Sequence, residues 1–465
     1  MKDLRGVLRR LFHSAVVWSW AMNGFRLASG ILLLPLLLDI LPKPELGIYY
    51  LFLQLYALLP VIDLGFSVSV GRYVSYAMGG ARELKPLGLI AHQKGREPNL
   101  DLLWQLLQTT RRLFQFMSIG AFVLMGGIGT WAVSVRVHDT ADPSFTWMAW
   151  AITLSAAVLE IYAGWWNVFL RGMNQVLVSA RISVAAYATK LLLACALLLA
   201  GAGLLAVPIA SLASSLILRV WSRHLCLKRL GPRLADAGGN ASALLKVMWP
   251  TSWRAGLQFL SLYLATHANG IICMTVFGLV ANAAFGLSLQ VTLLIQGMAS
   301  VWTLVKWPIV GQYRAREDTE GLRQILWGRI WLQAITYIAM AVAAWWFGPL
   351  LLQWHGSGKE LLPPALFAIL LLNGFMEINF SFWTTLLSTE NRVPSLWPTV
   401  ISNVCSLILV LILVNVSTLG MGALVIPPLL TGMIFGYWYW PFRGAKSLKT
   451  SWLRYTFLGP DRSGA

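Results

Sequence analysis

The sequence has little charge and few cysteines. Only 12% of its 465 residues are charged, 57% are hydrophobic and the mean hydropathy is +0.67, whereas an ordinary soluble domain carries about 25% charged residues. So few charged side chains cannot cover a water-exposed surface, and the composition predicts an integral membrane protein. The sequence implies neither a disulfide framework nor a cysteine metal site, because no CxxC spacing joins the four cysteines Cys195, Cys226, Cys273 and Cys405.

Motifs for nucleotide and zinc chemistry are also missing. The sequence contains no Walker A loop, no GxGxxG after a strand and no HExxH. We therefore expect no enzymatic activity and no bound cofactor. His267 is the only histidine deep in an expected span, and it is interpreted either as a hydrogen-bonded structural group or as a proton relay.

Apolar runs of about 20 residues recur along the chain and are long enough to cross a bilayer as helices. They predict an all-α polytopic membrane protein with twelve transmembrane helices, at residues 14–38, 46–70, 113–134, 146–170, 177–200, 203–222, 252–277, 280–303, 325–350, 362–387, 396–416 and 421–441. We expect two six-helix bundles around a central cavity. The expected parts are an N-terminal bundle, a cytoplasmic linker, a C-terminal bundle and an amphipathic cytoplasmic tail, at residues 1–222, 223–250, 251–441 and 442–465.

The formal net charge of +18 is explained by topology. Lys and Arg cluster in alternate loops, which is the pattern that membrane insertion selects, so no nucleic-acid partner is expected. The opposite loops hold three basic residues, Lys43, Arg136 and Lys359, against the five acidic residues Asp39, Glu45, Asp139, Asp142 and Glu360. Both termini are therefore predicted to face the cytoplasm.

The chain contains an internal repeat. A shift of 217 residues superposes residues 151–212 on residues 368–429, with 14 identities in 62 positions. The informative pairs are Glu160 with Glu377, Trp166 with Trp383, Asn174 with Asn391, Val176 with Val393, and Gly203 with Gly420. With an even number of spans in each half, the halves are predicted to be parallel repeats, and the working site is expected near the bilayer midplane between them.

Six ionisable side chains fall inside the expected spans: Arg26, Asp63, Glu160, Lys190, Arg254 and Glu377. Facing lipid, each would cost about 3 kcal/mol at the bilayer centre, or about 18 kcal/mol together, which exceeds a typical net folding stability of about 5–15 kcal/mol. We expect them to face water, one another or a ligand. Polar residues at helical spacing, including Asn23 and Gln258, extend these faces, and such stripes indicate either a wet cavity or interhelical hydrogen bonding.

Asp63 and Arg72 belong to one expected span but lie at different depths. At a rise of 1.5 Å per residue, counted from Gly47, Asp63 lies about 24 Å and Arg72 about 37 Å along the helix. Arg72 is therefore expected to anchor in the cytoplasmic headgroups. Asp63 is still in the core, where it is expected either to cap a helix that restarts before Gly65 or to pair with a basic group.

The sequence contains four segments in this order: ELGIYYLFLQLYALLPVIDLGFSVSVGRYVSYAMGGA, RGMNQVLVSARI, GAGLLAVP and STENRVPSLWPTV. In this order they resemble bacterial polysaccharide transporters of the O-antigen flippase family. The resemblance implies the fold of the multidrug/oligosaccharidyl-lipid/polysaccharide (MOP) exporter superfamily. It also implies a flippase that moves an undecaprenyl-pyrophosphate-linked oligosaccharide to the periplasmic leaflet of the bacterial inner membrane by alternating access. That activity would serve the biosynthesis of O-antigen, capsule or exopolysaccharide.

The resemblance also implies partners and a cavity lined with basic residues. The partners would be the lipid-linked oligosaccharide, membrane lipids and the polysaccharide polymerase machinery. The substrate-binding candidates are Arg26, Lys190, Arg254, Asn23 and Gln258, because arginines from two halves can bind phosphate bidentately. For proton or sodium coupling the acidic candidates are Glu377 first, Glu160 second, and Asp63 as a further cavity residue; a structural ion pair is the alternative for the glutamates.

Two other functions stay open from the sequence. An ion-coupled multidrug antiporter of the same superfamily would need an acidic, aromatic cavity; Glu160 and Glu377 favour it, and the basic residues oppose it. A membrane polymerase or ligase of lipid-linked glycans would need a substantial periplasmic loop with catalytic groups, and the predicted loops have about ten residues or fewer.

Overall fold

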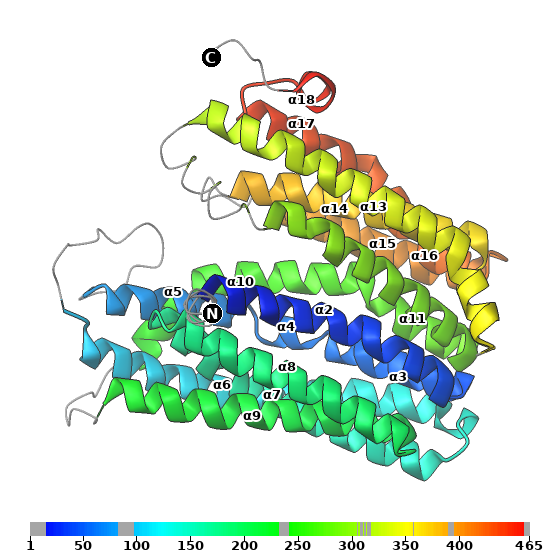
Figure 1. Ribbon diagram of the computed structural model, residues 1–465, viewed down its shortest axis with the longest axis horizontal. Coiled ribbons are helices and arrows are strands. Elements are labelled where there is room, and N and C mark those ends of the chain that lie inside the picture. Colours follow the sequence, from blue (N-terminus) through cyan, green and yellow to red (C-terminus); the bar gives the residue numbers. More distant parts are fainter. Residues whose placement is uncertain are drawn as a thin grey trace, which may run out of the picture. The chain divides into compact units, whose positions relative to one another are not determined.

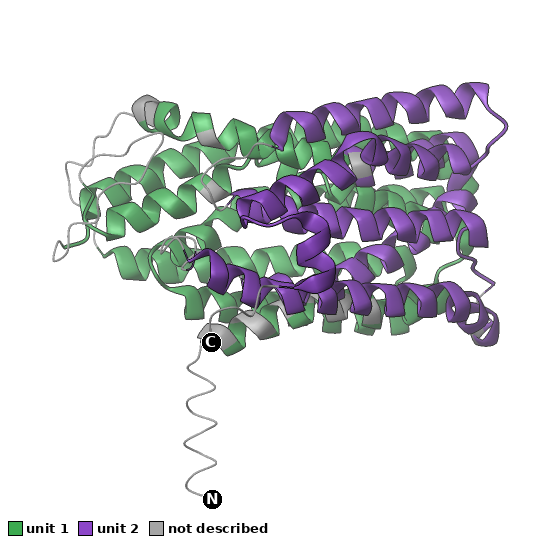
Figure 2. Cartoon of the chain, turned by 90° about the horizontal axis from the view of Figure 1, so that it is seen from above, with its two compact units in different colours: residues 1–263 green, residues 264–465 purple. Residues whose placement is uncertain are grey.

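The computed structural model describes residues 15–81, 97–231, 241–304, 306, 310, 313, 318–356, 358–388 and 395–459. In these ranges the chain is helical and contains no strand, which confirms the all-α fold class. It divides into two compact units, residues 1–263 (unit 1) and residues 264–465 (unit 2) (Figure 2).

Unit 1 is built from long helices joined by short turns. Its elements are α2 (Ala15–Ile40), α3 (Lys43–Tyr56), α4 (Leu59–Ile62), α5 (Phe66–Met78), α6 (Leu100–Arg136), η1 (Val137–Asp139), α7 (Pro143–Gly172), α8 (Val176–Leu199), η2 (Gly203–Leu205), α9 (Ala206–Leu230) and most of α10 (Ala241–Thr266). Helix α7 packs against α6 and α9, and α8 packs against α9 and α2 (Figure 1). Polar caps set helix starts, since Asn99 accepts from the Leu102 amide and Asp142 from the Phe145 amide, each at 3.0 Å.

The second expected span is broken into three helices, α3, α4 and α5. The last break lies at Gly65, whose φ of +72° is a left-handed conformation that favours glycine. Asp63 caps the helix that restarts there: it accepts from the Ser67 amide at 3.2 Å and from the Ser67 hydroxyl at 2.8 Å. The structure thus shows the capping contact, the first of the two sequence interpretations of Asp63.

Helix α10 packs tightly against this break. A Cβ on Gly65 would lie 2.4 Å from the Ala255 Cβ, and a Cβ on Gly256 would lie 2.8 Å from the Leu64 Cα. Hydroxyl bonds strengthen the contact, since Ser69 and Ser252 share one at 2.8 Å. Most of α10 therefore belongs to unit 1, and the division at residues 263/264 differs from the predicted linker at 223–250, which assigned the seventh span to the C-terminal bundle.

Unit 2 contains the remaining helices: α11 (Ala268–Leu304), α13 (Thr319–His355), α14 (Pro364–Ser388), α15 (Leu396–Val416), α16 (Gly422–Thr431), η3 (Gly432–Gly436), α17 (Tyr437–Ser447) and α18 (Trp452–Leu458). Helix α11 packs against α13 and α14, and α14 packs against α16 and α17. Its apolar core includes Phe285, Tyr337, Phe367 and Leu424. A second cluster around Trp383, Trp440 and Tyr455 holds the C-terminal segment.

The last expected span of unit 2 is irregular. Helix α16 contains Pro427 and Pro428, and a π-helical turn, η3, separates it from α17. A proline cannot donate the helical backbone hydrogen bond, so it favours such an interruption. The turn also depends on Gly432, because a Cβ there would lie 2.3 Å from the Tyr437 ring. Single π turns inside α-helices occur frequently at functional sites.

The sequence repeat is also a structural repeat. Helices α7 and α8 correspond to α14 and α15, and α8 and α15 end at equivalent residues, Leu199 and Val416. The turns that follow are alike, since Gly203 has a φ of +51° and Gly420 a φ of +55°. The copies then diverge: α9 continues unbroken to Leu230, whereas η3 interrupts its counterpart.

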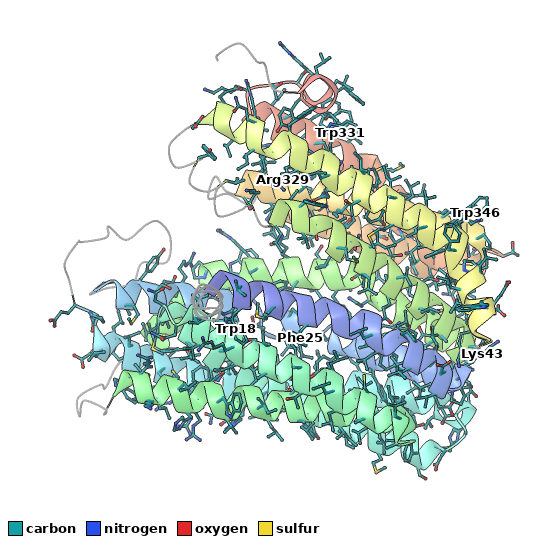
Figure 3. The ribbon with its side chains drawn as sticks, viewed as in Figure 1. Trp18, Phe25, Lys43, Arg329, Trp331 and Trp346 are labelled. Carbon is teal, nitrogen blue, oxygen red and sulfur yellow. The ribbon has the colours of Figure 1, made fainter. Side chains whose placement is uncertain are left out.

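Ten helical segments in the described ranges are apolar and long enough to cross a membrane. One of them, Ser252–Leu304, covers both the seventh and the eighth expected spans. Tryptophans such as Trp331 and Trp346 lie far apart on α13 (Figure 3), and Trp346 is 61% exposed. This is a position where an indole ring suits a membrane interface.

The C-terminal tail packs against unit 2. Arg323 donates to the Leu448 carbonyl at 2.7 Å, and Trp331 donates to the Thr456 carbonyl at 2.8 Å. Leu448 and Tyr455 are buried in the core cluster around Trp383. The apolar side chains that α18 leaves exposed are Leu453, Phe457 and Leu458.

Candidate functional site

Glu377 is held by neutral partners in unit 2. It lies in the middle of α14, and its carboxylate accepts from the Tyr437 hydroxyl at 3.0 Å. The same hydroxyl lies 2.8 Å from the Asn373 side-chain oxygen. One phenolic proton thus faces two acceptors. A protonated Glu377 would satisfy both contacts, because it would donate to the phenol oxygen while the phenol donates to Asn373.

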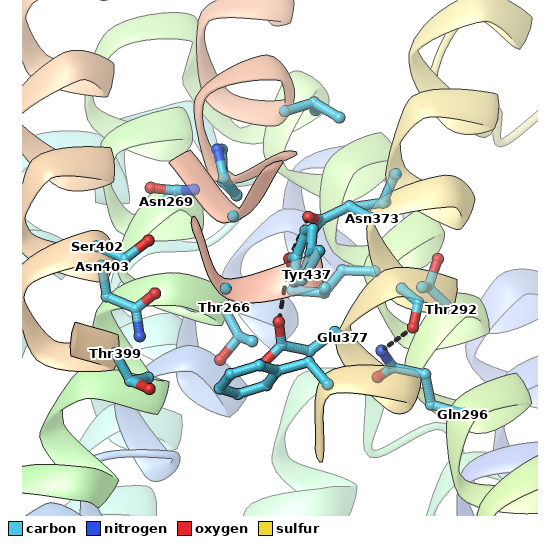
Figure 4. A pocket seen from close by; sticks show the side chains of 18 of the residues that line it. Thr266, Asn269, Thr292, Gln296, Asn373, Glu377, Thr399, Ser402, Asn403 and Tyr437 are labelled. Carbon is cyan, nitrogen blue, oxygen red and sulfur yellow. Dashed lines mark hydrogen bonds between the residues drawn. The ribbon is translucent and has the colours of Figure 1, made fainter. Parts of the chain in front are cut away.

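The surrounding pocket is small and combines apolar and polar side chains. Its volume is about 70 Å³, whereas a water needs about 10–15 Å³ and drug-sized ligands occupy about 300–1,000 Å³. Figure 4 shows Glu377 and Tyr437 close together, with further polar side chains around them. The labelled ones are Thr266, Asn269, Thr292, Gln296, Asn373, Thr399, Ser402 and Asn403. No Lys or Arg occurs among the described residues that line it.

Unit 1 contains a related arrangement around Tyr56. The Tyr56 hydroxyl donates to Glu160 at 2.6 Å, and the Lys190 ammonium lies 5.9 Å from the centre of the Tyr56 ring. Glu160 occupies the repeat position of Glu377, so both acidic side chains bind a phenol. The phenols come from different places, α3 for Glu160 and α17 for Glu377. The Tyr56 side chain thus lies near both Glu160 and Lys190.

Tyr56 lines two cavities of unit 1. The smaller one, about 40 Å³, is lined by Lys190, Tyr49 and Thr153 among others. The larger one, about 580 Å³ and open, is lined by Asp63, Glu160 and Arg171 together with aromatic and small residues. This larger volume lies within the range of small-molecule binding sites.

The structure places the other predicted residues as follows. Arg254 and Gln258 are exposed on α10, one turn apart, and the Arg254 guanidinium lies 5.6 Å from the Trp253 ring centre. Neither lines the two cavities at Tyr56. The side chains of Asn23 and Arg26, on α2, lie outside the described part of the structure. His267 occupies the one-residue turn between α10 and α11 and is half-buried.

Two functional candidates escaped the sequence reasoning. In the sequence Tyr437 is one of many aromatic residues near span ends. The structure shows that it follows the π turn and that its hydroxyl donates to Glu377. Arg171 lies near the end of α7, and the sequence does not show that it lines two adjoining cavities. In the described ranges no three His, Cys, Asp or Glu residues cluster as they would to hold a metal ion.

Comparison with solved structures gives close matches in fold. The chain is similar to an inward-facing multidrug resistance MATE family transporter of the MOP superfamily, with a TM-score of 0.63 and 13% identity over 92% of this chain and 95% of the other. It is also similar to the MATE multidrug transporter DinF-BH in complex with R6G, with a TM-score of 0.60 and 15% identity over 92% and 94% of the two chains. The chain shares its fold with these two proteins.

A third similar structure is a MOP superfamily transporter from Pyrococcus furiosus whose binding pocket is described as reversed in polarity, with a TM-score of 0.59 and 17% identity over 95% and 98% of the two chains. No family model matches the sequence, and no curated protein matches it. At these identities the likeness concerns the fold alone. Together with its apolar helices, this fold identifies the chain as a multi-pass membrane protein.

Proposed function

We propose that the chain is an ion-coupled transporter that works by alternating access. The observation that carries the proposal is Glu377, a carboxylate in the membrane-spanning part of unit 2 whose hydrogen-bond donor is the neutral Tyr437. An ionisable carboxyl group inside a membrane costs folding free energy, so such a residue is interpreted as functional unless shown otherwise. Its pocket has room for water or a small cation, and proton or sodium uptake would balance the charge.

Glu377→Gln tests the coupling. In proteoliposomes with the purified protein, an imposed proton or sodium gradient should drive substrate accumulation by the parent chain and fail to drive it in the variant. Facilitated exchange without a gradient should persist, because the substrate site is proposed to lie elsewhere. Glu320→Gln, at the exposed start of α13, is the matched control. Unchanged gradient dependence in Glu377→Gln would reject the assignment.

For the substrate, we propose an oligosaccharide on an undecaprenyl pyrophosphate carrier, moved from the cytoplasmic to the periplasmic leaflet of the bacterial inner membrane. The four quoted sequence segments support this substrate, and so do the basic residues at membrane depth. A pyrophosphate head with several sugars cannot cross hydrocarbon, whereas the polyprenyl tail stays in lipid. In this proposal Arg26 and Arg254 bind phosphate and Lys190 adds positive charge, with Asn23 and Gln258 as neighbouring polar contacts.

The second candidate is a multidrug antiporter. The solved structures favour it more directly than the flippase, because two of those described above are multidrug transporters. The large cavity of unit 1 also offers two carboxylates, Asp63 and Glu160, to an organic cation. The pocket at Glu377 is too small for such a substrate and would serve the coupling ion instead.

Reconstituted protein distinguishes the two substrates. A flippase should expose a fluorescent polyprenyl-pyrophosphate glycan to an external quencher, and Arg26→Ala and Arg254→Ala should abolish this while the protein remains in the membrane. An antiporter should instead accumulate a cationic dye against a gradient. Dye transport without glycan translocation would reject the flippase and support the second candidate.

A further inference from the structure

The C-terminal helices of unit 2 carry a local concentration of positive charge. Residues 437–459, which form α17, α18 and the turn between them, include four basic residues and no Asp or Glu. All four basic residues are exposed: Arg443, Lys446, Lys449 and Arg454. A segment of this composition attracts anionic partners.

One side of α18 is fixed to α13, beside which it lies (Figure 1). Tyr455 is buried, and its hydroxyl donates to the Arg323 carbonyl at 2.8 Å. The indoles of Trp327 and Trp331 both donate to the Thr456 carbonyl, at 3.3 Å and 2.8 Å. A seven-residue helix is not stable alone in water. These contacts order α18 before it meets any partner, so binding costs little conformational entropy.

The side of α18 that points away from the protein is apolar. Leu453 and Phe457 are four residues apart and therefore share one face of the helix, where they are 58% and 65% exposed. The Phe457 ring also lies 6.3 Å from the Trp331 ring, edge to face. The exposed face of α18 is therefore continuous with the part of α13 that begins at Trp331.

Trp331 marks the start of the exposed apolar surface of α13. The residues four, seven and eleven positions after it lie on the same helix face and are at least half exposed: Ile335, Ile338 and Val342. Exposed apolar residues of α13 extend from Leu332 to Leu351, a length of about 29 Å at a rise of 1.5 Å per residue. This length matches a hydrocarbon core of about 30 Å. Trp331, and α18 beside it, therefore lie at the boundary of the hydrocarbon.

We propose that residues 443–459 bind the surface of a membrane that contains anionic phospholipids, on the side that the charge distribution assigns to the cytoplasm. Leu453 and Phe457 enter the boundary of the acyl chains, and the basic side chains contact lipid phosphates. An acidic protein partner would explain the charge, but it would not explain why the apolar face lies level with the end of the lipid-facing surface of α13. The proposal does not depend on the transported substrate.

Depth-dependent fluorescence quenching tests where the segment lies. The full-length protein is placed in phospholipid nanodiscs with bimane attached to Leu453→Cys or Phe457→Cys. Cys195 and Cys405 are replaced by serine, since the other two native cysteines are buried. Phospholipids brominated close to the headgroup should quench bimane at both positions about as strongly as at Ile335→Cys on the lipid-facing stripe.

The control for water exposure is Gln324→Cys, an exposed polar position two turns before Trp331 on α13. Aqueous iodide should quench bimane there strongly, and brominated lipid should quench it weakly. Quenching by iodide alone at both Leu453→Cys and Phe457→Cys would overturn the proposal, because the apolar face would then meet water or another protein.

The choice of lipid tests the role of the basic residues. Brominated phosphatidylglycerol should quench bimane at Leu453→Cys more strongly than brominated phosphatidylcholine at the same fraction. Replacing Lys446 and Lys449 together by glutamine should reduce this preference about twofold or more, and 1 M salt should remove it, because the Debye length falls to about 3 Å. The same change at Arg111 and Arg112, exposed arginines on α6, should leave the preference unchanged.

Unfolding temperatures of all variants, measured in the same nanodiscs, separate lost binding from lost folding. Equal quenching by the two brominated lipids in the parent sequence would overturn the proposal. A folded glutamine variant that kept the full preference for phosphatidylglycerol would overturn it as well.

Discussion

The two glutamates of the internal repeat each accept a hydrogen bond from a tyrosine hydroxyl, but their surroundings differ. Glu160 and Glu377 are equivalent in the repeat, yet Glu160 is exposed beside Tyr56 and Lys190, whereas Glu377 is half-buried beside Tyr437 and Asn373. A nearby ammonium stabilises a carboxylate, while a neutral phenol leaves its charge uncompensated. The two glutamates are therefore suited to different tasks, and Glu377 is a better candidate than Glu160 for binding the coupling ion.

Tyr437→Phe should impair release of the coupling ion without unfolding the protein. The substitution removes the hydroxyl that contacts Glu377 and Asn373. A hydrogen bond to a charged group contributes about 1.5–3 kcal/mol, and here it stabilises the ion-free carboxylate, so its loss should raise the apparent ion affinity about 10- to 100-fold. The ion dependence of uptake in proteoliposomes measures this change. Tyr439→Phe is the control, since its ring stacks on Phe435 and its hydroxyl contacts Arg443; an equal change there would contradict the assignment.

At the scale of elements, interruptions of helices position the functional groups. The break between α4 and α5 creates the N-terminus that Asp63 caps, and the π turn η3 sets the register of Tyr437 against Glu377. Both interruptions occur where a glycine allows an unusual backbone or a close contact. Neighbouring glycines therefore differ greatly in how well they tolerate an added methyl group.

Gly432→Ala and Gly436→Ala separate the effect of the π turn from that of helix composition. A Cβ at position 432 would lie 2.3 Å from the Tyr437 ring and must displace it, whereas a Cβ at 436 makes an ordinary contact at 3.8 Å with Phe380. Gly432→Ala should shift the apparent ion affinity as strongly as Tyr437→Phe does. Gly436→Ala should transport like the parent in the same uptake assay, and equal defects in both variants would argue against a specific role for the turn.

Gly65→Ala should destabilise unit 1. The residue has a positive φ, and the new Cβ would lie 2.4 Å from the Ala255 Cβ, so strain and overlap together should cost at least about 2 kcal/mol. Thermal unfolding in detergent micelles measures the loss. Gly120→Ala on α6 is the control, because its Cβ would meet nothing within 4 Å, and the better helix propensity of alanine should make it neutral or stabilising by up to about 1 kcal/mol.

Sequence reasoning located most of the elements and fewer of the contacts. Hydropathy predicts most of the long helices because lipid imposes length and composition, but the seventh expected span, 252–277, is divided at His267 between α10 and α11. The repeat predicts the paired glutamates and the equivalence of Gly203 and Gly420. The partners of those glutamates depend on the η3 register, which no local pattern encodes. The assignment of α10 to unit 1 likewise depends on small residues, Gly65 and Gly256, that match only when the helices are packed.

At the scale of the whole molecule, the distribution of basic residues predicts how the chain is inserted. The loop that contains Arg136, Asp139 and Asp142 carries little positive charge, whereas the connections rich in Lys and Arg alternate with it. Alkaline phosphatase inserted after Ala141 should be active, and green fluorescent protein fused after Ala465 should fluoresce. If the fluorescent protein at the C-terminus did not fluoresce and alkaline phosphatase fused at the same place were active, the orientation would be the reverse of the predicted one.

The interrupted span in the second copy of the duplication has an evolutionary consequence. After a gene duplication, the equivalent glutamate in each copy can gain a different hydrogen-bond partner, provided that the copy still folds. Here one segment is a continuous helix and the other contains a π-helical interruption. Inactivating either acid should therefore leave the chemistry of its twin intact, so that losses in single and double variants multiply instead of saturating.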